Sequence, residues 1–240
     1  MSNYFLFVGL PYLAIVIMLV GSIARYRNKG FTVSSLSTQF LEGKTLFWGS
    51  QPFHWGMMFL FFGHLIAFLF PSSVIAFNGE PIRLFILEIS AFAFGLATLF
   101  GIVMLLIRRL SNKRVSMVTS NMDMVVFFIV LVQVISGLWV AYFHRYGSTW
   151  FATSITPYLR SILTLNPDIA TISAMPIAVK IHVISAFSLI ALIPFTRFMH
   201  FLVYPIAYLW RPYQKVIWYW DRKEIRKSTK WVFGKRSKNN

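Results

Sequence analysis

Cysteine is absent from this chain of 240 residues, and acidic side chains are scarce. Without cysteine there can be no disulfide, no thiolate-held iron–sulfur cluster and no haem attached through thioether bonds. Asp and Glu together number 7 against 23 Lys and Arg. Two of these acids, Glu88 and Asp123, lie near the ends of apolar segments, so carboxylate-built metal sites inside such segments are disfavoured.

Hydrophobic residues dominate the composition, at 57% against 12% charged residues, and mean hydropathy is +0.65. Five apolar segments are long enough to cross about 30 Å of hydrocarbon at about 1.5 Å per residue. They run near residues 5–23, 54–70, 84–107, 124–143 and 179–204. The first has spanning length and no cleavage-site pattern, so we expect it to be retained. An all-α membrane protein with five transmembrane helices is predicted, in the inner (plasma) membrane.

Basic residues cluster in alternate connections between the apolar segments. They fill the links at 24–53 and 108–123 and the end of the chain beyond 210, whereas the connections at 71–83 and 144–178 hold few. The positive-inside rule places the N-terminus outside and the C-terminus inside. The net charge of +16 therefore reflects topology and contact with membrane lipid, and nucleic acid is not an expected partner.

Two further regions are distinctive, one inside this membrane domain of residues 1–210 and one after it. The outer connection at 144–178 mixes aromatic and aliphatic residues with few charges, which is typical of an amphipathic segment on the membrane surface. Residues 211–240 form a basic, aromatic-rich cytoplasmic tail. An interfacial helix and a solvated basic tail both fit that composition.

Four histidines lie inside two of the apolar segments, which points to function because ionisable residues in hydrocarbon are costly. His54 and His64 are ten residues apart, about 15 Å in depth. His182 and His200 are eighteen apart, about 27 Å. The two axial nitrogens of one haem are only about 4 Å apart, since imidazole binds a metal at about 2 Å. Each haem must therefore bridge the two helices.

Depth decides which histidines share a haem. The two helices run in opposite directions, so His54 and His200 lie near the inner face and His64 and His182 near the outer face. The two intervals differ by about 12 Å, which helix tilt and a kink at Pro194 would reduce. We expect the irons to be on the order of 20 Å apart. The alternatives for a membrane histidine are a packing residue or a proton relay; His144 is not expected to be a ligand.

The residues around these histidines resemble the gamma subunit of respiratory nitrate reductase from about Pro11 to Gln214. The similarity covers PYLAIVIMLVGSIARY, FHWGMMFLFFGHL, RRLSNKRV and KIHVISAFSLIALIPFTRFMHF, with Asp123, Gln133 and Gly137 in the fourth segment. It continues through Pro205, Tyr208 and Leu209. The histidine spacings of ten and eighteen and the PFTR sequence are specific to that family.

This resemblance implies a membrane cytochrome b with two b haems. His64 and His182 would hold the outer haem, and His54 and His200 the inner one. Quinol would be oxidised near the outer haem, and electrons would pass inward through both haems to an iron–sulfur subunit and a molybdenum catalytic subunit. Nitrate chemistry would belong to those partners on the cytoplasmic side.

The resemblance also carries four other residues. Gly63 matches the family's quinone-pocket glycine, and Arg83 stands where the family usually has a quinol-binding Lys. Lys180 replaces a family Arg before the third histidine and, like Arg197, is a candidate partner of a haem propionate. The chain also runs about 25 residues past Lys215, where family members commonly stop.

Two other functional readings fit the sequence. A similar cytochrome could serve another quinone-linked oxidoreductase, such as a heterodisulfide-reductase-like, sulfite-reductase-linked or nitrite-oxidising complex with reversed electron flow. A haem-free transporter or scaffold is the alternative from a different class.

Overall fold

The computed structural model describes residues 2–30, 33, 38–39 and 41–202 of the chain. Five helices in it are long and apolar enough to cross a membrane, at Phe5–Lys29, Lys44–Leu69, Pro81–Ser111, Asn121–Phe143 and Ile177–Phe195. Five membrane-spanning helices, as predicted, are therefore confirmed, although the fifth covers only part of its predicted segment. The predicted tail at 211–240, and Pro205, Tyr208 and Leu209 before it, lie outside the described residues.

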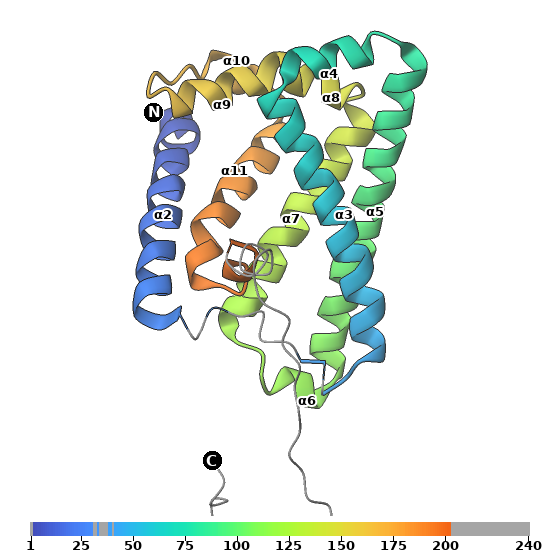
Figure 1. Ribbon diagram of the computed structural model, residues 1–240, viewed down its shortest axis with the longest axis vertical. Coiled ribbons are helices and arrows are strands. Elements are labelled where there is room, and N and C mark those ends of the chain that lie inside the picture. The colour runs from blue at the N-terminus through green and yellow to red at the C-terminus, as the bar shows by residue number, and fades with distance from the viewer. Residues whose placement is uncertain (1, 31–32, 34–37, 40, 203–240) are drawn as a thin grey trace, which may run out of the picture. The chain divides into compact units, whose positions relative to one another are not determined.

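The long helices are α2 (Leu10–Lys29), α3 (Lys44–Leu69), α5 (Pro81–Ser111), α7 (Asn121–Phe143) and α11 (Ile177–Leu192). Figure 1 shows them side by side, with short helices across one end. α3 packs along α5, α5 against α7, α7 against α11, and α11 against α2. α3 and α5 approach closely, because a Cβ on Gly101 would lie 2.5 Å from the backbone nitrogen of Phe53. The two histidine-bearing helices, α3 and α11, are thus not consecutive in the packing order.

The polar ends of the helices extend past the apolar segments. α3 begins at Lys44, ten residues before His54, and continues through Pro52. His54 therefore lies about 15 Å from the start of its helix rather than at its end. Hydropathy marks only the apolar part of a helix, whereas hydrogen bonding continues into the interface.

The connections predicted to be loops at the outer side are largely helical. They contain α4 (Pro71–Asn78), α8 (Gly147–Trp150), the π-helix η3 (Phe151–Ile155), α9 (Thr156–Leu163) and α10 (Ala170–Ala174). We call the end that carries them the predicted outer end. The apolar face of α9 packs on the long helices, because its Tyr158 and Ile162 are buried in one cluster with Phe7, Val140 and Val183. The predicted amphipathic segment therefore covers the helix ends, with its apolar side against protein.

Two short elements precede α2: the helix α1 (Ser2–Tyr4) and then the π-helix η1 (Phe5–Gly9). The buried hydroxyl of Tyr158 donates to the carbonyl oxygen of Phe7 at 2.8 Å. Burial raises the pKa of the Tyr158 hydroxyl well above its usual value. The covering segment is thereby tied to the first long helix.

At the opposite, predicted inner end, the buried side chain of Arg108 forms an ion pair with the half-buried Glu42. Arg108 near the end of α5 donates to Glu42 at 2.6 Å and to the hydroxyl of Thr38 at 2.8 Å. Burial acts to raise the pKa of the Glu42 carboxyl, but the backbone N–H of Thr45 and the Arg108 guanidinium outweigh it and lower that pKa. The short helix α6 (Lys113–Ser116) follows α5 at this end.

The fifth segment is not one continuous helix. α11 ends at Leu192, a 3-10 turn covers Ile193–Phe195 (η4), Thr196 is extended, and residues 199–202 are helical again. The kink expected at Pro194 is thus a break, because proline lacks the N–H that helix continuation requires. Arg25 of α2 donates to the carbonyl oxygens of Pro194 and Thr196, both at 2.8 Å, and so satisfies groups that the break leaves without helical partners. Figure 1 shows the chain turning aside after α11.

Candidate functional site

His64 of α3 and His182 of α11 form a ring pair near the predicted outer end. Their ring centres are 6.3 Å apart, and the ring planes differ by 33°. Two imidazole nitrogens at about 2 Å from one metal place the ring centres about 6 Å apart, since each centre lies about 1 Å behind its nitrogen. The observed separation fits two axial ligands on opposite sides of one iron.

A pair of ligands suits haem better than a bare ion. Groups of three or more His, Asp or Glu that could hold a metal ion are absent from the described part of the chain. A porphyrin supplies four nitrogens itself, so that two protein ligands complete the iron. The residues present therefore fit a haem.

All four histidines have Nδ1 within hydrogen-bond distance of a carbonyl oxygen, and in three of them the carbonyl lies three or four residues earlier in the chain. Nδ1 of His54 is 2.7 Å from the oxygen of Ser50, and Nδ1 of His64 is 2.7 Å from that of Leu60. His200 makes the same contact with Arg197 at 2.5 Å. Because a carbonyl can only accept, Nδ1 carries the proton and Nε2 has the lone pair that a metal requires.

His182 is held by α7. Its Nδ1 is 3.0 Å from the carbonyl oxygen of Gln133, and its Nε2 is 3.1 Å from the side-chain amide nitrogen of the same residue. Ser136 lies 3.2 Å from Nδ1. A Cβ on Gly137 would lie 2.8 Å from Cε1 of His182, so glycine leaves the room that the ring occupies. Metal binding through Nε2 requires the Gln133 amide to release that nitrogen.

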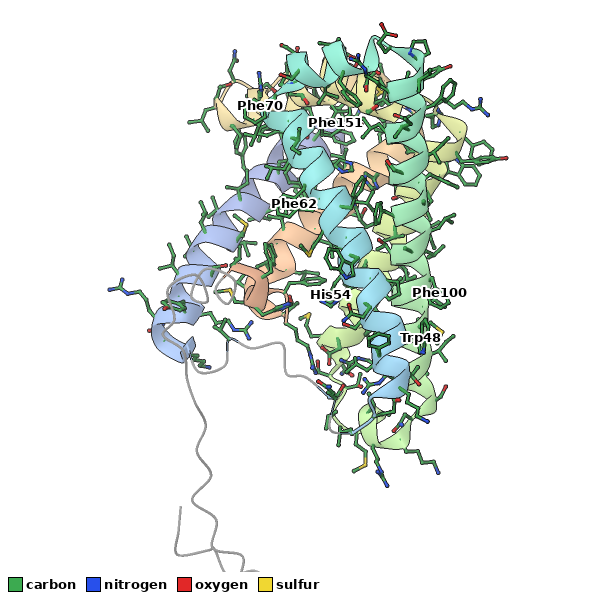
Figure 2. All side chains as sticks on the ribbon, turned by 45° about the vertical axis from the view of Figure 1, so that its right-hand side comes forward. Trp48, His54, Phe62, Phe70, Phe100 and Phe151 are labelled. Carbon is green, nitrogen blue, oxygen red and sulfur yellow. The ribbon has the colours of Figure 1, made fainter. Side chains whose placement is uncertain are left out.

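His54 and His200 lie farther toward the predicted inner end. His54 is exposed on α3, and Figure 2 shows it near the middle of that helix. His200 is half-buried beyond the break at Pro194. From His182 to Phe195 the chain advances about 21 Å along α11 and the 3-10 turn before it turns aside. That is less than the roughly 27 Å that an unbroken helix would cover between His182 and His200, so the break reduces the depth mismatch with His54 and His64.

The two propionate candidates differ in their surroundings. Arg197 donates from Nε and Nη2 to the carboxylate of Asp123 at 2.8 and 3.0 Å. One edge of the guanidinium is therefore taken up by α7. Lys180 is half-buried in the first turn of α11, two residues before His182.

The two quinol candidates lie at the predicted outer end. A Cβ on Gly63, the residue before His64, would meet nothing within 4 Å, so the space at Gly63 is open. Arg83, in the first turn of α5, is exposed and has its guanidinium 5.8 Å from the ring centre of Phe77. Among the described residues it makes no hydrogen bond or ring contact with His64.

Two residues near His64 were missed in the sequence. The ring of Phe151, presented by the π-helix η3, meets His64 edge-on at 5.2 Å. Figure 2 shows Phe151 at the predicted outer end. Arg160 of α9 donates to the carbonyl oxygens of Phe68 and Leu69 at 3.0 and 3.2 Å, and so caps the end of α3. Neither contact follows from local pattern, since both depend on how the covering segment folds back.

Comparisons with known proteins cover nearly the whole chain. The family model described as nitrate reductase gamma subunit matches residues 3–219. The nitrate reductase gamma chain of Bacillus subtilis is 32% identical over 217 residues, 89% of this chain and 97% of that one. The respiratory nitrate reductase 1 gamma chain of Escherichia coli is 29% identical over 219 residues, 89% and 96% of the two chains. A nitrate reductase-like protein of Mycobacterium tuberculosis is 30% identical over 220 residues, a third of its length.

Proposed function

Because the chain belongs to the nitrate reductase gamma subunit family, we propose that it is the quinol-oxidising cytochrome b of a nitrate reductase complex. It is a multi-pass inner-membrane subunit of that complex. It takes electrons from quinol near the outer face and delivers them to an iron–sulfur subunit at the inner face. A molybdenum subunit beyond that partner reduces nitrate.

The observation that carries this proposal is the 6.3 Å separation of the ring centres of His64 and His182. His64 and His182 hold the outer haem through Nε2, and His54 and His200 hold the inner one. When bound, two b haems supply one-electron carriers between the faces of the membrane. Two histidines for each haem would complete the coordination of its iron and leave no room for nitrate, so nitrate reduction would belong to a partner.

Quinol binds at the open space on Gly63, the residue before His64. Arg83 donates a hydrogen bond to a quinone oxygen, for which its exposed side chain turns away from Phe77. The fixed charge of arginine makes it a poor proton acceptor, so the two protons of quinol pass to water at the outer face. Two electrons leave inward for each quinol, and charge crosses the membrane without a proton pump.

Lys180 and Arg197 complete the haem sites as propionate partners, with Arg197 also bound to Asp123. The tail at 211–240 offers either a docking surface for the inner subunits or a clamp on the membrane. A chain truncated after Lys215 separates these roles: if the complex stays intact in detergent, the tail does not dock the partners.

The proposal is tested with the purified complex by dithionite-reduced difference spectra, haem quantification and quinol-driven haem reduction. The variant His64→Ala is expected to lose one of two haems together with quinol-driven reduction. His144→Ala is the matched control, because His144 ends α7 and its backbone oxygen accepts from Trp150. Absence of b-type bands from the wild-type protein would favour a transporter or scaffold. Co-purification of subunits other than an iron–sulfur and a molybdenum protein would favour another oxidoreductase.

A further inference from the structure

α7 carries none of the four histidines, yet it contacts both ligand regions of the fifth segment. At one level it holds His182 directly, through the backbone oxygen of Gln133, the hydroxyl of Ser136 and the space left by Gly137. The hydroxyl of Ser185 on α11 in turn donates to the side-chain oxygen of Gln133. The position of the His182 ring is therefore set from α7.

At a second level α7 holds His200 through one intermediate residue. Asp123 in the first turn of α7 binds the guanidinium of Arg197 with two hydrogen bonds. The backbone oxygen of Arg197 then accepts from Nδ1 of His200 at 2.5 Å. Arg109 joins the same carboxylate at 3.5 Å, and the Asp123 side chain is only 11% exposed. Asp123 is thus largely shielded from water, whereas Arg197 and His200 are half-buried.

The two residues of α7 at which these contacts begin, Asp123 and Gln133, have the same spacing as the two histidines of α3. Asp123 and Gln133 are ten residues apart on α7, and His54 and His64 are ten residues apart on α3. Each interval is about 15 Å on a straight helix. The fifth segment has eighteen residues between its histidines and a break at Pro194. In an unbroken helix His182 and His200 would be about 27 Å apart, farther than the roughly 15 Å between His54 and His64. Another element therefore has to set the position of His200.

We propose that α7 is the template that aligns the fifth segment with α3, with Asp123 and Gly137 as the positioning residues for the inner and the outer haem. Asp123 acts through Arg197 on His200, and Gly137 acts by leaving space for His182. This inference rests on the proposed function, because it assumes that the four histidines hold two haems.

Asp123 also caps α7, and the test must separate that role. Ser120 and Asp123 form a reciprocal capping box, with the Ser120 hydroxyl accepting from the backbone N–H of Asp123 at 3.1 Å. The variant Ser120→Ala weakens the cap and leaves the carboxylate facing Arg197. The variant Asp123→Asn keeps the size of the side chain and removes the charge that holds the guanidinium.

The role of Gly137 at the outer haem is tested against a matched control, Gly95. Gly137→Ala places a Cβ 2.8 Å from a ring atom of His182, and Gly95→Ala places one 2.8 Å from the side-chain tip of Leu138. Both substitutions add one methyl group where α7 contacts another helix. Only the methyl group at Gly137 meets a proposed haem ligand, His182.

The four variants are compared in the haem-loaded complex by electron paramagnetic resonance, redox titration and haem content. Asp123→Asn is expected to shift the signal and potential of the inner haem alone and to weaken its retention about tenfold, as loss of a partner behind a ligand does. Gly137→Ala is expected to do the same to the outer haem alone. Ser120→Ala and Gly95→Ala are expected to change neither. If Asp123→Asn does not accumulate, Asp123→Glu keeps the charge and is expected to give a smaller shift of the inner haem alone.

An inner haem unchanged in Asp123→Asn, or equal changes in both haems in any accumulating Asp123 or Gly137 variant, overturns the template. An equal effect from Ser120→Ala overturns it as well, because helix capping alone would then explain the result. Wild-type protein without haem would refute the proposed function itself. Two normal haems with no selective response would refute only the inference.

Discussion

Tyr158 of the covering segment donates its buried hydroxyl hydrogen to the carbonyl oxygen of Phe7, 151 residues earlier in the chain. Phe7 lies in a π-helical turn, and Tyr158 is 2% exposed. The contact joins the first span to α9 at the predicted outer end. Phe7 and Tyr158 also share a buried cluster with Val183, the residue after His182 on α11.

Replacing Tyr158 with Phe is expected to destabilise the protein by about 1 to 2 kcal/mol, because the buried oxygen of Phe7 loses its donor. Thermal unfolding in detergent measures this, with Tyr146→Phe as the control at an exposed tyrosine. Burial raises the pKa of Tyr158, so the contribution is complete below about pH 10 and is lost at higher pH. Equal melting of the two variants would contradict the role of this bond.

Replacing Glu42 with Gln is expected to cost about 1 to 2 kcal/mol, since the buried guanidinium of Arg108 loses its charge partner but keeps its hydrogen bonds to Thr38 and to the backbone oxygen of Glu42. The pKa of Glu42 is lowered in the folded protein. Its contribution is therefore present above the unfolded pKa of about 4.3 and disappears as pH falls through the folded pKa. Melting temperature measured against pH checks both points. Glu80→Gln, at an exposed carboxylate, provides the comparison and is expected to melt like the wild type.

Replacing Gly63 with Val is expected to raise the KM for quinol several-fold without lowering the melting temperature. The added side chain meets no protein atom at its Cβ, so its effect falls on whatever enters the open space. Gly30→Val is the matched control, because a Cβ on Gly30 also meets nothing within 4 Å. Gly30 follows the last residue of α2, at the predicted inner end. Unchanged quinol kinetics in Gly63→Val would move the quinol site away from His64.

Replacing Phe151 with Ala is expected to lower the midpoint potential of the outer haem and leave the inner one unchanged. The ring covers one edge of His64, and water admitted in its place favours the oxidised, more positive iron. Redox titration followed optically measures the shift, with Phe70→Ala as a control at an exposed phenylalanine of the same end. A shift of both haems together would argue for a general loosening of the fold.

The five helices could be predicted because length and hydropathy alone decide what crosses hydrocarbon. The positions of His54 and His200 could not. Helix α3 starts ten residues before His54 in sequence too polar for a hydropathy window, and the segment before His200 leaves the helix at Pro194. Spacing on an ideal helix therefore overstated the depth mismatch between the two histidine pairs.

The partners of the histidines were beyond sequence reasoning for a different reason. Gln133, Asp123 and Gly137 stood out only through resemblance, since their roles depend on which face of α7 meets α11. Phe151 and Arg160 gave no local signal, because a π-helical turn and a folded-back connection bring them to α3. Contacts between distant elements set these positions.

The break at Pro194 has a consequence for how the chain enters the membrane. α11 has 16 residues, fewer than the roughly 20 that span a bilayer as a regular helix. The turn that completes its crossing exposes carbonyl groups, and the guanidinium of Arg25 on α2 accommodates two of them. Unpaired carbonyls are costly in lipid, so the last span reaches its final form only against the first. Biosynthesis from the N-terminus supplies the two in that order, and a chain permuted to make the fifth span first would lose this advantage.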